Sequence, residues 1–271
     1  MKIVKIFACL FCTLCLSTNI YGLFFKSELN PYISNTKIHK VDLNFEKRLS
    51  DKHELNEMAF NKIQFDQVIR LNKLFAESIV HYWPDYNYFY LGENWIIFSL
   101  QRIERLFGSQ NNFFGNHERF KWERVVETGF GLCSQISMAL YDFLTKKNQG
   151  ASIIALNGHV VVGATINEES YILDPDYDVV IRGRLSDIQS NSMLIKKAYR
   201  DRGYSESLSN EIVKIYSTTS DNTENTLWEY YPKYMLFYYS TEVLKWLLPI
   251  LIFAIIILVK SRNMKSKYDI K

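Results

Sequence analysis

The longest apolar runs of the chain lie at its two ends. Towards the C-terminus, the run from Val243 to Val259 holds a single charged residue, Lys245, which is close enough to the edge to snorkel. At about 1.5 Å per helical residue the run spans roughly 25 Å, near the lower limit for crossing a bilayer. We therefore predict a transmembrane helix over residues 243–260, with a buried core helix as the alternative.

Charges beside the two apolar runs predict an orientation in a membrane. Residues 261–271 are basic, which favours a cytoplasmic tail. Residues 1–22 carry Lys2 and Lys5, then about a dozen apolar residues and a small-residue exit, which is typical of a secretory signal peptide. The same segment could remain uncleaved as an N-terminal anchor. Either reading predicts a body displayed outside the cytoplasm on a single-pass C-terminal helix.

Between the ends, the pattern changes from polar to helical. Residues 23–50 are polar and irregular, which predicts a linker or arm. Apolar residues then recur at three- and four-residue steps over about 52–82, 92–108, 133–150 and 192–216, which predicts helical stretches. The apolar positions of the 92–108 stretch share one face: Ile96, Leu100, Ile103 and Phe107.

A group of short β-branched segments interrupts the helical pattern after residue 150. "ASIIALNG", "HVVVGATI" and "SYILDPD" are separated by turn residues and predict an antiparallel meander, with "DVVIRG" as a possible fourth strand. Helices that precede a run of strands are typical of the α+β class. We predict one α+β domain over residues 51–235.

Composition excludes several classes of function. The 271 residues carry a net charge of +3, and no basic run with interleaved aromatics appears in the middle of the chain, which argues against nucleic acid. The five histidines are scattered without ligand spacing, so we expect no metal and no cofactor. Cys9, Cys12 and Cys15 match an iron–sulfur run only superficially, in their spacing; they fit better as apolar filler of the N-terminal segment.

The fourth cysteine, Cys133, stands alone in the body of the chain, which excludes an internal disulfide there. It follows Gly129 and Gly131 in "GFGLCSQIS" and begins a predicted helix. The partial positive charge at a helix start stabilises a thiolate, and N–H groups there could hold an oxyanion. The alternative is a small buried hydrophobic residue that happens to start a helix.

Two further residues could complete a nucleophilic site. His159 opens a predicted strand after the Asn157-Gly158 turn, and Asp174 ends the next strand. Across an antiparallel hairpin the carboxylate could orient the imidazole and stabilise the imidazolium. The alternatives are a half-buried strand-end histidine and a turn-forming aspartate before a proline, and Asp176 and Asp178 compete for the same role.

Taken together, "GFGLCSQISMALYDFL", "GHVVVGATI" and "YILDPDYDVVI" resemble the transglutaminase-like superfamily, which has a papain-like core. The resemblance covers roughly residues 90–185. It implies a cysteine helix packed on an antiparallel sheet and a triad of Cys133, His159 and Asp174. Ser134 stands where animal transglutaminases have an aromatic residue, which puts protein crosslinking itself in doubt.

The oxyanion side chain is the least determined part of this site. Gln101 is our first candidate, and Gln110 and Asn112, which also lie upstream of the cysteine, are alternatives among which the sequence does not choose.

The sequence therefore predicts a membrane-anchored, extracytoplasmic, cysteine-dependent acyl-transfer enzyme. It would hydrolyse, deamidate or transamidate a protein or peptide amide through a thioester on Cys133, with partners in envelope or polysaccharide assembly. One alternative is a catalytically inert binding or assembly module on the same scaffold. Another is a structural partner that packs the aromatic 227–239 segment on lipid or on a membrane protein.

Overall fold

A computed structural model describes residues 2–24, 52–58, 64–81, 89–108, 113–115, 117–218 and 222–268. Two compact units emerge from the contacts along the chain. The helical unit comprises Met1–Lys26, Tyr86–His117 and Lys233–Lys271, and the sheet unit comprises Ser27–Asp85 and Glu118–Pro232. Residues 86–117, which we predicted within a single domain, group with the two ends of the chain. The predicted arm lies almost wholly outside the described residues.

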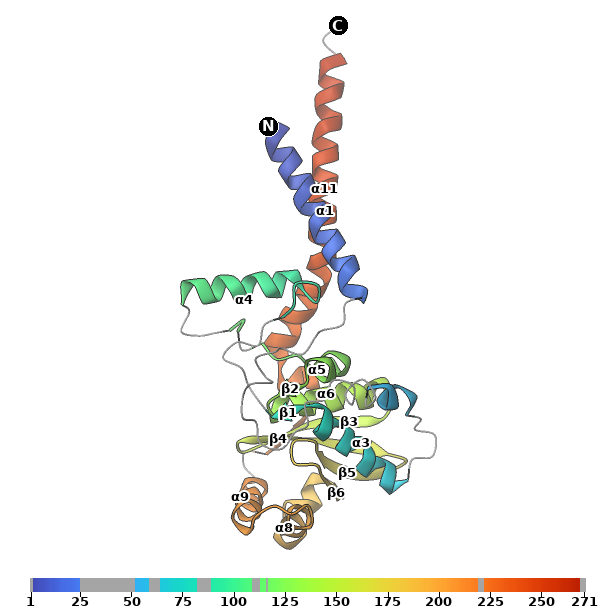
Figure 1. The fold of residues 1–271 in the computed structure, drawn as a ribbon, viewed down its shortest axis with the longest axis vertical. Coiled ribbons are helices and arrows are strands. Elements are labelled where there is room, and N and C mark those ends of the chain that lie inside the picture. Colours follow the sequence, from blue (N-terminus) through green and yellow to red (C-terminus); the bar gives the residue numbers. More distant parts are fainter. Residues whose placement is uncertain are drawn as a thin grey trace. The chain divides into compact units, whose positions relative to one another are not determined.

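The sheet unit is built on one five-stranded antiparallel sheet in the order β6-β5-β4-β3-β7 (Figure 1). Its strands are β3 (Gly150–Leu156), β4 (His159–Ile166), β5 (Glu169–Asp174), β6 (Val179–Arg182) and β7 (Thr223–Asn225). The predicted meander, including its fourth strand, is confirmed. The edge strand β7 was missed, because its residues Thr-Glu-Asn read as loop and become a strand only by pairing with β3. The mixed architecture agrees with the predicted α+β class.

Helices cover both faces of this sheet. One face packs on α3 (Phe65–Ser78), α5 (Trp122–Thr128) and α6 (Cys133–Lys146), and the other on α7 (Leu185–Ile188), α8 (Ser192–Asp201) and α9 (Glu206–Ser217) (Figure 1). Central strand β4 is therefore buried on both sides, with one exposed residue among eight, which explains why it reads as an unbroken apolar run.

Two short parallel strands fix the segment that leads into α6. β1 (Val80–His81) pairs with β2 (Phe130–Gly131), with His81 opposite Gly131. The predicted helical stretch of residues 52–82 is divided: residues 52–57 are helical, α3 follows, and an extended Ile79 carries the chain into β1. A short helix, α10 (Leu227–Tyr230), closes the unit with a capping box between Thr226 and Glu229.

The helical unit contains α1 (Lys2–Phe24), α4 (Trp95–Phe107) and α11 (Pro232–Tyr268). By length and composition, residues 3–24 and 232–259 could each cross a membrane. The predicted transmembrane run is thus part of a longer helix that begins at Pro232 and includes the aromatic residues before the run. α4 agrees with the predicted helix over 92–108, and the Asn94 side chain caps it by accepting from two backbone N–H groups.

The buried face of α4 is not its apolar face. Ile97, Gln101 and Glu104 are its buried residues, whereas Ile103 is 49% exposed and Phe107 84% exposed. The Glu104 carboxylate accepts from the N–H groups of Phe114 and Gly115, so polar contacts within the unit hold this face.

Helices α1 and α11 are joined by a polar contact at a proline. Pro249 has no N–H group, so the carbonyl of Lys245, four residues earlier, lacks its usual intrahelical donor. Asn19 of α1 donates to that carbonyl at 2.6 Å, and the Trp95 indole approaches it at 3.4 Å. Asn19 is buried, with 4% of its surface exposed. The proline thus creates an acceptor that a side chain of the N-terminal helix satisfies.

Candidate active site

Cys133 is the first residue of α6. Leu132 at the N-cap supplies no side-chain acceptor, and the first intrahelical bond runs from Ile136 N–H to Leu132. The N–H groups before Ile136 therefore lack intrahelical acceptors and point out of the helix start, beside the half-buried thiol. Gly131 permits this close turn, because a Cβ at that position would lie 3.0–3.2 Å from the Gln135 side chain.

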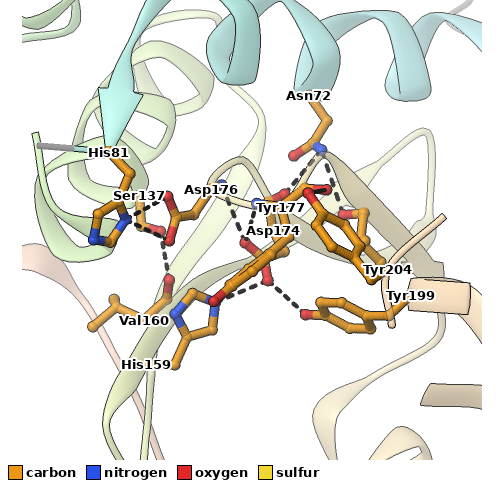
Figure 2. A network of polar contacts seen from close by, with 11 residues as sticks. Asn72, His81, Ser137, His159, Val160, Asp174, Asp176, Tyr177, Tyr199 and Tyr204 are labelled. Atoms are coloured by element: carbon orange, nitrogen blue, oxygen red, sulfur yellow. Dashed lines mark hydrogen bonds and ion pairs between the residues drawn. The ribbon is translucent and has the colours of Figure 1, made fainter. Parts of the chain in front are cut away.

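His159 is the first residue of β4, and only 5% of its surface is exposed. The hydroxyl of Ser137, one turn along α6 from the cysteine, donates to the Val160 carbonyl at 2.8 Å (Figure 2). This bond ties the helix to the strand beside the histidine. The thiol of Cys133, a ring nitrogen of His159 and a carboxylate oxygen of Asp176 all lie within 4.8 Å of one another.

Asp174 is the last residue of β5, and its buried carboxylate accepts four hydrogen bonds (Figure 2). Oδ2 accepts from His159 Nε2 at 2.8 Å and from the Tyr199 hydroxyl at 2.5 Å. Oδ1 accepts from the backbone N–H groups of Asp176 and Tyr177, at 3.1 and 3.2 Å. A buried charge with both oxygens satisfied in this way has a fixed orientation.

The structure therefore brings the three predicted residues together, with His159 between the other two. Burial disfavours the imidazolium, but the charge of Asp174 and its hydrogen bond outweigh burial, and Cys133 adds to them. The pKa of His159 is raised well above its ordinary value. Because Nε2 is bonded to Asp174, Nδ1 is the nitrogen left to exchange a proton with the thiol.

A second histidine–aspartate pair adjoins the first. His81 Nδ1 lies 2.7 and 2.8 Å from the two oxygens of Asp176 (Figure 2). The hydrogen bond to Asp176 raises the pKa of His81, although partial burial opposes it. Pairing of β1 with β2 holds this histidine opposite Gly131, two residues before the cysteine. The sequence offered no signal for His81, since its strand has only two residues.

Tyrosines enclose the His159–Asp174 pair. The ring of Tyr177 meets the imidazole edge-on, with centroids 5.3 Å apart, and the Tyr204 hydroxyl donates to the Tyr177 carbonyl. Tyr199 comes from α8 and is fully buried. Sequence analysis predicted a helical stretch over residues 192–216 but assigned neither Tyr199 nor Tyr204 to the site. The available signal was three tyrosines just downstream of the "LDP" motif.

A buried carboxyl, that of Glu118, contacts Ser134, the residue after Cys133. The Ser134 hydroxyl donates to Glu118 Oε1 at 2.8 Å, while Oε2 is buried without a hydrogen-bond partner among the described residues. Burial raises the pKa of Glu118 to about 7, and the bond from Ser134 only partly opposes this. Glu118 is therefore largely protonated below neutral pH, which limits negative charge beside the thiol.

The predicted oxyanion side chain has other partners. Gln101 belongs to the helical unit, where its Oε1 accepts from Phe89 N–H at 2.7 Å and its Nε2 donates to the Phe114 carbonyl at 2.8 Å. Its role in the site stays a prediction, and Gln110 and Asn112 lie outside the described residues. The backbone N–H groups at the start of α6 are the donors that the sheet unit offers near the thiol.

A surface cavity elsewhere in the sheet unit is separate from this chemistry. It lies towards the opposite end of β4 and β5 and is lined by Gly163, Thr165 and Ser170 among others, without any residue of the triad. The candidate active site is therefore identified by the side-chain geometry around Cys133 and not by this cavity.

A scan of protein-family models, a search of curated proteins and a search of solved structures found no match to this chain. The resemblance to transglutaminase-like proteins therefore depends on the quoted motifs, and the chemistry on the geometry of Cys133, His159 and Asp174.

Proposed function

We propose that this protein is a cysteine-dependent acyl-transfer enzyme of the transglutaminase-like type. The observation that carries the proposal is the buried imidazole of His159, which is bonded to the Asp174 carboxylate on one side and lies near the Cys133 thiol on the other. A nucleophile, a base within reach of it and a carboxylate that orients the base are the parts that such a reaction requires.

Acylation follows from these parts. Nδ1 of His159 takes the thiol proton, and the thiolate attacks the carbonyl carbon of an amide. N–H groups at the start of α6 donate to the developing oxyanion. When the tetrahedral intermediate collapses, His159 returns its proton to the leaving amine, and a thioester on Cys133 remains.

Deacylation regenerates the thiol. His159 accepts a proton from an incoming nucleophile, which attacks the thioester carbon and displaces the sulfur. Water yields a carboxylic acid, as in amide hydrolysis or deamidation, and an amine yields a new amide. A protein or peptide amide is the substrate class that we propose, with partners in envelope or polysaccharide assembly.

We propose further that both terminal helices cross the membrane and that α1 is retained. The support is the bond from Asn19 to the Lys245 carbonyl that Pro249 leaves without an intrahelical donor. Asn19 is buried and gives the shorter of the two hydrogen bonds to this carbonyl, the longer one coming from Trp95, so this contact favours keeping α1 beside α11. Lys245 is itself paired with Glu242 at 2.9 Å, as intramembrane charges usually are.

Flanking charges give this pair of helices one orientation. Lys2 and Lys5 lie at the start of α1, and the basic residues after Val259 lie at the end of α11 and beyond it. The positive-inside rule therefore assigns both ends to the cytoplasm. Two crossings then leave the sheet unit outside the cytoplasm, as the sequence predicted with one crossing.

The exposed side of α4 fits the same membrane. Ile103, Leu106 and Phe107 are three and four residues apart and all at least 49% exposed, and Arg102 and Arg105 beside them are exposed cations. In the helical unit α4 runs across the direction of α1 and α11 (Figure 1). An apolar stripe flanked by arginines is suited to lie in the lipid headgroup region.

Thiol reactivity tests the catalytic proposal. The full chain in detergent micelles is treated with iodoacetamide across pH, and alkylation of the Cys133 peptide is followed by mass spectrometry. We expect reaction well below the pH at which a free thiol reacts, and loss of this in His159→Ala. His53→Ala, an exposed histidine of the same unit, is the matched control. A thiol that reacts only after denaturation would support the inert binding module.

A further inference from the structure

Three side chains of different elements converge at one point in the sheet unit: Cys133 from α6, His159 from β4 and Asp176 from the turn after β5. Their sulfur, nitrogen and oxygen atoms lie within 4.8 Å of one another. Asp176 takes no part in the proposed proton transfer. These three ligand types are also the ones that zinc accepts in proteins.

We propose that these three side chains form a binding site for a zinc-like divalent transition-metal ion, which blocks the thiol while it is bound. The inhibition depends on the proposed function, whereas the metal binding does not. Three protein ligands leave one position of a tetrahedral ion open to water or to another ligand.

The separations require little movement. With ordinary zinc distances of about 2.3 Å to sulfur and about 2.0–2.2 Å to nitrogen and oxygen, tetrahedral ligand atoms are roughly 3.3–3.6 Å apart. Closing from 4.8 Å to that range requires side-chain shifts of about 1 Å. The Cys133 thiol and His81 give access to the site, since Cys133 is half-buried and the His81 side chain is 53% exposed, whereas the Asp176 side chain is 5% exposed.

Each of the two non-sulfur ligands already has the outer partner that such ligands have in zinc sites. The Nε2–H group of His159 donates a hydrogen bond to the Asp174 carboxylate, which leaves Nδ1 for the ion. Asp176 is held by His81 Nδ1, which lies almost equally far from both carboxylate oxygens.

The binding step balances with one proton. In the metal-free protein, one proton is shared between the sulfur of Cys133 and Nδ1 of His159. The ion displaces this proton and binds to both atoms. That proton is released to solvent, a metal–sulfur and a metal–nitrogen bond form, and no electron is transferred. The thiolate and the base are then both occupied, so neither can attack or accept a proton.

Cobalt(II) alone is the probe for this site. The full chain is prepared in detergent with Cys9, Cys12 and Cys15 changed to alanine, so that Cys133 is the one thiol. We expect a sulfur-to-cobalt charge-transfer band that zinc displaces, together with protection of Cys133 from iodoacetamide. Cys133→Ser should abolish the band.

Variants of one proposed ligand, Asp176, and of its outer partner, His81, make the test specific. Asp176→Asn should weaken cobalt binding at least about 10-fold, and His81→Gln, which changes an exposed side chain, by about 10-fold. Asp178→Asn on the same turn is the matched control and should bind like the parent, because its partners are Asn72 and Arg202. Absence of the band, its survival in Cys133→Ser, or unchanged affinity in Asp176→Asn overturns the proposal.

The two proposals fail separately. If the Cys133 thiol is inert in the metal-free protein but the cobalt band forms, the proposed enzymatic function is wrong and the proposed metal site is supported. If the Cys133 thiol is reactive but neither binds cobalt nor is protected by zinc, the proposed metal site is wrong and the proposed enzymatic function is supported.

Discussion

Replacing Asp174 by asparagine tests the triad most directly, because the surroundings of this carboxylate dictate the outcome. The amide oxygen is expected to take the place of Oδ1, which accepts two backbone N–H groups. The amide NH2 then faces the Tyr199 hydroxyl and His159 Nε2. The hydroxyl can turn to accept, but Nε2 can accept only if its proton moves to Nδ1.

This change of tautomer removes the base. Nδ1 then carries a hydrogen towards Cys133 and cannot take the thiol proton. With the carboxylate gone, burial disfavours the imidazolium and only Cys133 still opposes burial, so the pKa of His159 is expected to fall.

The expected magnitude follows from the fraction of thiolate. A free thiol with a pKa of about 8.5 is roughly 3% ionised at pH 7, whereas a thiolate–imidazolium pair is almost fully ionised, so alkylation at pH 7 should fall about 30-fold. Turnover of an amide should fall further, by about 10⁴-fold, as the same substitution does in a Ser-His-Asp triad.

The assay is iodoacetamide alkylation of Cys133 in the full chain, with circular dichroism to confirm folding. Tyr199→Phe is the informative companion, because it removes one donor to the same oxygen and keeps the charge. It should cost about 1.5–3 kcal/mol of stability while alkylation at pH 7 changes by less than about threefold. Asp174→Asn protein that is folded and alkylated like wild type would refute the reasoning.

Three other predictions concern pH and the membrane. Since burial raises the pKa of Glu118 from 4.5 to about 7, the folded state binds the proton more tightly, and stability falls by about 3 kcal/mol as pH rises from 4.5 through 7. Glu118→Gln should remove that fall and raise the thermal midpoint at pH 8 but not at pH 4.5; equal gains at both would contradict it. Asn19→Leu should weaken the association of α1 with α11, which would appear as a lower thermal stability in micelles. If mass spectrometry of the protein isolated from cells shows that residues 1–22 have been removed, the proposal of a retained α1 is wrong. The third test uses spin labels in vesicles, on a protein without its native cysteines. A label at Phe107→Cys should be more accessible to oxygen than to a water-soluble relaxing agent. A label at Met193→Cys, a position 82% exposed in the sheet unit, is the aqueous control. Equal aqueous access at both labels would contradict an interfacial α4.

Local rules were sufficient for the four strands of the meander and for most helices, but not for β1, β2 or β7. The segments from Gly150 to Arg182 alternate β-branched residues with short turns, and no other element competes for them, so the meander and its order followed from the pattern. α4 was predictable because Asn94 caps it and Gly108 ends it in a left-handed conformation. Its burial was not, because the apolar stripe indicated a core face, whereas polar contacts of Glu104 hold the opposite side.

The sequence by itself predicted that Cys133, His159 and Asp174 would meet, because each stands at the end of an element whose start or stop has a local signature: Gly-x-Cys, Gly-His and Leu-Asp-Pro. Only the tertiary structure decided what surrounds them. His81, Asp176 and Tyr199 reach the site from a two-residue strand, a turn and a helix of the opposite layer, and no local pattern encodes such meetings. The reason is physical: a helix or strand end follows from neighbouring residues, whereas the partner of a buried charge depends on which distant elements pack together.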